Sequence, residues 1–111
     1  MNYNVITIDK FKKEAKRLIK KYPSLKKELR ELSTILTANP TTGTSLGNNA
    51  YKIRIAIKSK GTGKSGGGRI ITYVISNNKE VYLMTIYDKA DLDTIDDKAL
   101  RRIIKIIKEE H

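Results

Sequence analysis

The chain has no cysteine, no tryptophan and a single histidine, His111. Without cysteine, neither a disulfide framework nor a thiolate metal site can form, and nothing indicates an oxidising compartment. The sequence opens without a basic segment followed by an apolar stretch, and no apolar run approaches the roughly 20 residues of a membrane span. We therefore expect a cytoplasmic protein with no membrane partner. One histidine also excludes two-histidine acid–base chemistry of the pancreatic-ribonuclease kind.

Positive charge is abundant. Lys and Arg number 23 against 12 Asp and Glu, a formal net charge of +11 in 111 residues. This excess indicates a polyanionic partner, with nucleic acid ahead of a membrane surface. The alternative is a lysine-rich surface that serves only solubility, and the positions of the charges must decide between the two. The length suits one domain that spans residues 1–111.

The N-terminal third predicts a short strand and two helices. Residues 2–8 have strand character, and Asp9 is placed to cap a helix whose apolar residues follow one stripe. Pro23 ends that helix and Ser24 is placed to cap the next, whose buried leucines extend to Leu36. The short connection predicts that the two helices are antiparallel neighbours.

The rest of the chain predicts strands and a final helix. After a loop at 41–50, apolar and basic residues alternate, which is typical of a half-buried strand with one cationic face. A flexible glycine-rich loop and two strands that are apolar on both faces follow, and these strands should be central. The fold class is α+β, a small antiparallel sheet packed with helices in the order β-α-α-β-β-β-α. The expected ranges are strand 51–58, loop 59–68, strands 69–75 and 81–87, an acidic stretch 88–97 and helix 97–109.

Two motifs resemble ligand sites but fail on their residues. GTGKS at 61–65 ends like a phosphate-binding P-loop, but Lys58 stands where that motif needs glycine, and the segment leads into a strand instead of a helix. The acidic stretch lacks the glycine of a calcium loop, because Asp93 or Asp96 occupies its place. Helix capping by Asp96 or Asp97 explains these carboxylates better. We expect no metal and no cofactor.

The basic strand faces are the remaining candidates for chemistry. RNA carries its own nucleophile, the 2′-OH, so a protein that holds a phosphodiester in line needs to supply only positioning, charge neutralisation and proton transfer. A lysine crowded by other cations can act as the general base. Tyrosines beside the cations can stack a base or orient a proton, although each also fits a core position. The candidates are Lys52, Arg54, Arg69, Tyr87 and Lys89 for catalysis, and Lys58, Lys60, Lys64 and Tyr73 for RNA binding.

The stretch YKIRIAIKSKGTGKSGGGRIITYVI followed by VYLMTIYDKADL, about residues 51–92, resembles the RelE/HigB toxins of bacterial type II toxin–antitoxin modules. The resemblance implies an antiparallel sheet flanked by helices, metal-independent endoribonuclease action on mRNA in the ribosomal A site, and a cognate antitoxin. In that family basic strand residues cradle the phosphate, and these positions fall on Lys52, Arg54 and Arg69, with Lys64 as a weaker match.

The chain departs from the family pattern after the last strand. Ala90 stands where an arginine is expected and no tyrosine follows Tyr87, so Lys89 substitutes only in part, because lysine lacks the guanidinium fork. Two other functions fit the same charges: a non-catalytic RNA-binding or ribosome-binding protein, and a ParE-like gyrase inhibitor. An antitoxin is expected to cover the cationic face with acidic residues or to displace the helix 97–109.

Overall fold

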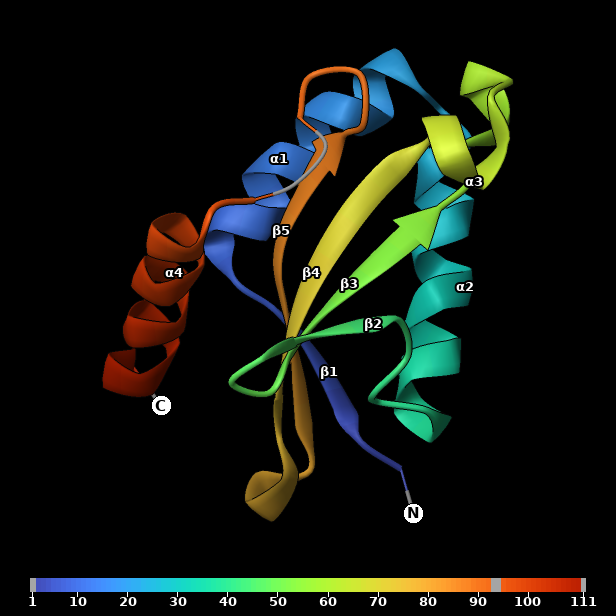
Figure 1. The fold of residues 1–111 in the computed structure, drawn as a ribbon. Helices are drawn as coiled ribbons and strands as arrows, with labels where there is room; N and C mark the ends of the chain where they lie inside the picture. Colours follow the sequence, from blue (N-terminus) through green and yellow to red (C-terminus); the bar gives the residue numbers. More distant parts are fainter. Residues whose placement is uncertain (1, 93–94, 111) are drawn as a thin grey trace.

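A five-stranded sheet in the order β1-β5-β4-β3-β2 forms the centre of the molecule (Figure 1). The computed structural model describes residues 2–92 and 95–110, so Asp93 and His111 lie outside the described residues. The strands are β1 (Asn4–Thr7), β2 (Thr44–Gly47), β3 (Ala50–Ile55), β4 (Gly68–Ile75) and β5 (Glu80–Asp88). The helices are α1 (Asp9–Lys21), α2 (Leu25–Ala38), the single turn α3 (Gly63–Gly66) and α4 (Asp97–Glu110).

The expected α+β class and the order of the predicted elements are confirmed, but the sheet is mixed. β1 runs parallel to β5, with Asn4 opposite Glu80, whereas the other strand pairs are antiparallel. β1 is followed by α1 and α2 and is not joined to β5 by a tight turn. A tight turn would require antiparallel pairing, whereas this long connection allows β1 to run parallel to β5. The two helices run in opposite directions and are inclined to each other (Figure 1).

The expected loop 41–50 contains an unpredicted strand, β2, which forms a hairpin with β3. The two residues of its turn, Asn48 and Asn49, both have positive φ, 53° and 64°. This is the backbone of a type I′ turn, which matches the twist of the flanking strands and which asparagine tolerates. The sequence Asn-Asn therefore carried a hairpin signal, but the TSLG segment before it shows no apolar alternation.

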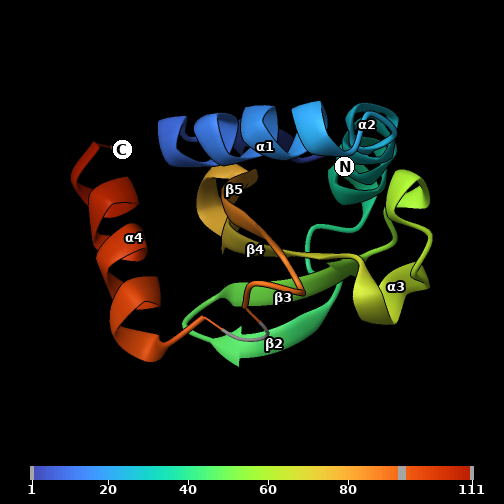
Figure 2. The ribbon, with the colours of Figure 1, turned by 90° about the horizontal axis from the view of Figure 1, so that it is seen from above.

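Helices cover both faces of the central strands (Figure 2). On one face, α1 and α2 pack over a cluster that includes Ile53, Ile70 and Leu83. On the other, α4 packs over a second cluster that includes Met84 and the fully buried Tyr82. β4 and β5 therefore contact apolar side chains on both faces, as their composition predicted.

The helix termini differ in part from the predicted caps. Asp9 is the first residue of α1 and lies in its first turn, while Ile8 is the N-cap. The Ser24 side chain makes no capping bond to α2, and its hydroxyl accepts instead from the backbone N–H of Ser59 at 2.9 Å. Asp96 does cap α4, because its Oδ1 accepts from the N–H of Ala99 at 2.8 Å.

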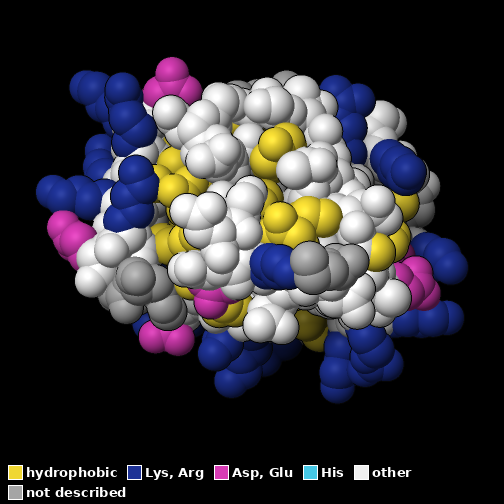
Figure 3. All heavy atoms as spheres, turned by 90° about the horizontal axis from the view of Figure 1, so that it is seen from below, with side chains coloured by type: hydrophobic (Ala, Val, Ile, Leu, Met, Phe, Trp, Pro, Cys, Tyr) yellow, Lys and Arg dark blue, Asp and Glu magenta, His cyan; other side chains and the backbone are white. Residues whose placement is uncertain are grey.

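Positive side chains are spread over the surface, as the view from below illustrates (Figure 3). Charge alone therefore does not locate a functional site, and the geometry of individual side chains must do so. In the part of the chain that the structure describes, no helix has the length and apolar character needed to cross a membrane.

Candidate RNA-binding site

Three of the predicted catalytic residues lie in one row across the sheet. Arg54 on β3 is directly opposite Arg69 on β4, which is directly opposite Tyr87 on β5. Lys52 lies two residues before Arg54 and therefore points to the same face. The strand register thus makes these residues neighbours on the sheet, but their side chains differ in exposure.

Arg69 is buried, with 2% of its surface exposed. Its Nη1 donates hydrogen bonds to the carbonyl oxygens of Lys64 and Gly68, both at 3.0 Å, and its Nη2 donates to that of Ser65 at 3.1 Å. The predicted contact between Arg69 and a phosphate is wrong for this conformation, because the guanidinium is engaged by backbone. We therefore infer that Arg69 holds α3 in place through these hydrogen bonds.

Lys60 also differs from its predicted role in RNA binding. Its ammonium group forms an ion pair with Asp88 and donates to the carbonyl oxygen of Gly66 at 2.6 Å, and only 13% of its side chain is exposed. The Asp88 carboxylate also accepts from the Tyr22 hydroxyl at 2.9 Å and from the Ala90 N–H at 3.0 Å. Lys60 is therefore a structural residue that holds the glycine-rich loop against the end of β5.

Burial of Asp88 by itself raises the pKa of its carboxyl group. Hydrogen bonds from Lys60, from the Ala90 N–H and from Tyr22, with the positive charge of Lys60, outweigh that effect. Together they hold the pKa of Asp88 below its ordinary value of 3.8. The carboxylate is therefore ionised at neutral pH, as the ion pair requires.

The loop 59–68, expected to be flexible, is folded. It begins in a 3-10 turn, Lys58–Lys60, and continues into α3. Gly67 closes it, because a Cβ atom at this position would lie 2.1 Å from the carbonyl oxygen of Ile55. Only glycine allows this close approach of two backbone segments.

Substitution of Gly67 by alanine tests this packing. The added methyl group must push the loop away from β3, so we expect the free energy of unfolding to fall by about 2 kcal/mol. Urea denaturation measures the change, with Ser65→Ala at an exposed position of the same loop as the control. Equal stability of the two variants would contradict the close approach.

The exposed cations of the predicted set gather at one place. Arg54, Lys58 and Lys64 line a hollow of about 290 Å³ between α2 and β3, here called the α2–β3 hollow. Glu28 and Glu31 of α2 line it too, and the Glu28 carboxylate accepts from the Lys58 N–H at 2.8 Å. Sequence reasoning missed both glutamates, although their three-residue spacing places them on one face of the helix.

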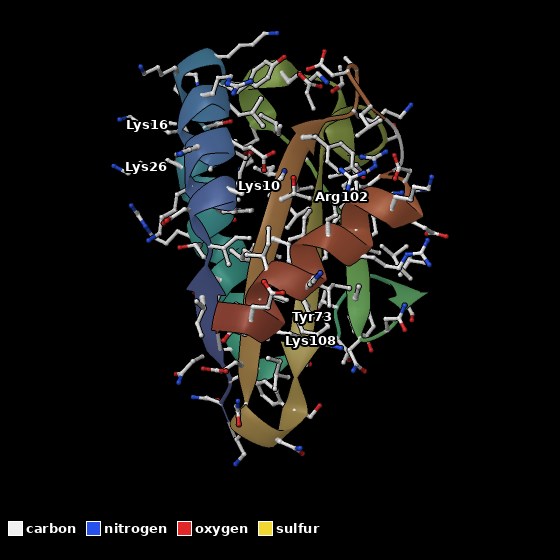
Figure 4. All side chains as sticks on the ribbon, turned by 90° about the vertical axis from the view of Figure 1, so that its left-hand side faces the viewer. Lys10, Lys16, Lys26, Tyr73, Arg102 and Lys108 are labelled. Atoms are coloured by element: carbon white, nitrogen blue, oxygen red, sulfur yellow. The ribbon has the colours of Figure 1, made fainter. Side chains whose placement is uncertain are left out.

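The other predicted residues lie around this cluster or within the core. Tyr73 is 6% exposed and packs beneath α4 (Figure 4), so its predicted stacking on an RNA base is wrong. Tyr87 is half-buried with its hydroxyl inside the fold. Lys52 and Lys89 are half-buried, and the Lys89 N–H donates to the carbonyl oxygen of Gly67 at 3.0 Å.

This arrangement can bind a polyanion. Arg54, Lys58 and Lys64 are exposed and line one hollow beside Glu28 and Glu31, where the three cations can contact neighbouring phosphate groups. The buried Arg69 and the partly buried Lys60 hold the loop that follows Lys58 and carries Lys64. Within residues 2–92 and 95–110, no cluster of three histidine, cysteine or carboxylate side chains comes together as a metal site would require.

No known protein-family profile matches the sequence. Among solved structures, the chain is similar to the Escherichia coli toxin RelE, a double arginine-to-alanine mutant in the free state, with a TM-score of 0.61 and 17% sequence identity. The match covers 84% of this chain and 90% of the RelE chain. The fold is therefore RelE-like.

Proposed function

We propose that this chain is the toxin of a type II toxin–antitoxin pair, a cytoplasmic endoribonuclease that cuts mRNA in the ribosomal A site. The observation that carries the proposal is the cluster of Arg54, Lys58 and Lys64 on one hollow of a RelE-like fold. The resemblance of residues 51–92 to RelE/HigB toxins supports the same function from the sequence. A cognate antitoxin would neutralise the toxin.

The proposed reaction uses the nucleophile of the RNA itself. The 2′-hydroxyl gives up its proton to a base in the site as its oxygen forms a bond to the adjacent phosphorus. The P–O5′ bond breaks and a proton is delivered to the departing 5′-oxygen, which leaves a 2′,3′-cyclic phosphate and a 5′-hydroxyl end. Negative charge builds on the phosphate oxygens. In this proposal Arg54 stabilises that charge, and Lys58 and Lys64 hold the neighbouring phosphates. The proposed site is completed by Lys52 within β3, Tyr87 near the end of β5 and Lys89 just after it.

Loss of Arg54 tests the proposal. Arg54→Ala should lower the cleavage rate by roughly a hundredfold, because one preorganised charge is removed from the transition state. After brief expression in bacteria, new 5′-hydroxyl ends are mapped on translated and untranslated transcripts. Lys13→Ala is the matched control, because it removes one exposed positive charge on α1, outside the hollow.

Each alternative function gives a different result in this experiment. Cuts confined to translated messages, lost in Arg54→Ala and kept in Lys13→Ala, would support a ribosome-dependent nuclease. Growth arrest without new ends would favour a gyrase inhibitor. RNA binding without arrest or cuts would favour a non-catalytic RNA-binding protein. In that case Arg54→Ala should weaken RNA affinity and flatten its salt dependence by roughly one phosphate contact.

A further inference from the structure

A second cationic surface lies on the outer side of the first two helices. It is a shallow furrow of about 410 Å³, here called the α1–α2 furrow. Its floor is apolar and is formed mainly by Phe11, Ala15 and Ile19. Four exposed lysines surround this floor, and no acidic residue is among the described residues that line it. The lysines are Lys12, Lys16, Lys20 and Lys26.

The carboxylates of the same two helices lie elsewhere. Glu14 accepts hydrogen bonds from the Thr85 hydroxyl at 2.8 Å and from the Ile86 N–H at 3.2 Å, on the sheet side of α1. Glu28 and Glu31 line the α2–β3 hollow. None of these carboxylates lines the furrow, whose charged residues are all lysines.

The lysines follow the repeat of a helix. Lys12, Lys16 and Lys20 are four residues apart and therefore lie along one ridge of α1, about 6 Å from one to the next. Lys26 stands on α2 across the furrow. Figure 4 shows Lys16 and Lys26 pointing to the same side of the molecule, away from the sheet, whereas Lys10 points toward β5.

We propose that the α1–α2 furrow is a docking site for an acidic amphipathic helix of a partner protein. Such a helix would place an apolar stripe on the Ala15–Ile19 floor and carboxylates at four-residue spacing beside the lysine ridge. An RNA backbone matches the positive charge but has no apolar surface for the floor, so the furrow fits a peptide better. The site is separate from the α2–β3 hollow and does not require RNA cleavage.

A designed peptide serves as the probe. It is a helix of about the length of α1, with leucines at i, i+3, i+4 and i+7 and glutamates on both sides of them. A second peptide replaces the leucines by serines at the same charge, and a short RNA duplex is the third probe. Methyl signals of Ala15 and Ile19 in NMR spectra of the full chain report contact with the floor of the furrow.

We expect the leucine peptide to bind saturably and to shift both methyl signals. Lys12→Gln combined with Lys16→Gln should weaken its binding roughly tenfold. The control, Lys13→Gln with Lys27→Gln, removes the same charge from exposed positions outside the furrow and should bind as the unaltered chain does. Arg54→Ala should also bind normally, which separates this proposal from the proposed nuclease function.

Three results would overturn the proposal. The first is leucine-peptide binding that leaves the Ala15 and Ile19 signals unchanged. The second is equal affinity for the leucine and serine peptides, which would show that charge alone drives binding. The third is an RNA duplex that shifts both methyl signals when the leucine peptide does not, which would make the furrow an RNA contact.

Discussion

Arg69→Ala should lower the free energy of unfolding by about 3 kcal/mol. The substitution leaves the carbonyl oxygens of Lys64, Ser65 and Gly68 without the donors they now have, in a place that is part-buried at Lys64 and Ser65 and buried at Gly68, where each lost partner costs about 1 kcal/mol. It also opens a cavity at a side chain that is 2% exposed. Urea denaturation at neutral pH measures the loss.

Arg54→Ala is the matched control for this experiment. It removes the same side chain from the directly opposite position on β3, where the residue is exposed. Its stability should change by less than about 0.5 kcal/mol. If both variants were equally stable, Arg69 would not hold the loop as described here. Arg69→Lys should restore only part of the stability, because a single ammonium group cannot span the carbonyls that the guanidinium fork reaches.

The different stabilities expected for Arg69→Ala and Arg54→Ala affect how a loss of toxicity is interpreted. Loss of toxicity in a variant that lacks both arginines would combine a stability defect with a defect at the site. The single variants separate them: Arg54→Ala should fold normally and cut RNA poorly, whereas Arg69→Ala should lose activity with its fold. Thermal denaturation of each purified variant, measured beside its cleavage rate, distinguishes the two causes.

Lys60→Met should lower the free energy of unfolding by about 3 kcal/mol at neutral pH. The substitution leaves the Asp88 carboxyl group 3% exposed, with hydrogen bonds from Tyr22 and Ala90 but without its cation. Methionine keeps most of the apolar stem, so the loss reports the charge and its hydrogen bonds. Lys64→Met, at an exposed position of the same loop, is the control and should be nearly neutral.

Acid should reduce the difference in stability between the unaltered chain and Lys60→Met. The pKa of Asp88 is held below 3.8 in the folded protein, so the unfolded state binds more protons as the pH falls through that region. The stabilisation by the ion pair is therefore complete above the unfolded pKa and is lost as the pH falls through the folded one. Urea denaturation at pH 7, 5 and 3 should show the unaltered chain approaching Lys60→Met in stability at the lowest of these values. A gap that widens in acid would contradict the ion pair.

The sequence predicted the elements whose burial determines where their apolar residues stand. β4 and β5 are apolar at nearly every position because both of their faces are covered, and α4 has a stripe because only one of its faces is covered. The direction of β1 relative to β5 leaves no such pattern in the sequence. Its register places Asn4 opposite Glu80, a residue far along the chain, and no local pattern specifies that pairing.

The site could be predicted only where a residue's role follows from its own strand. Alternation predicted that Arg54 is exposed between two buried isoleucines of β3, and the structure confirms this exposure, whereas Lys52 on the same face is half-buried. Lys60 and Arg69 are both basic in sequence, but each is engaged by partners that the local pattern does not reveal. Asp88, which binds Lys60, is 28 residues away. The acceptors of Arg69 are backbone carbonyls, which are the same for every residue type and leave no trace in composition.

The five consecutive carbonyl oxygens of residues 64–68 each accept a hydrogen bond from Lys60 or Arg69. Lys60 and Arg69 therefore hold this segment through its main chain, and the side chains of Lys64 and Ser65 are exposed to solvent. The backbone conformation of the loop therefore does not depend on which side chains stand at these two positions. A library of residues other than proline at these positions should mostly yield folded proteins, so the loop offers a place to redesign which polyanion the molecule prefers without rebuilding its framework.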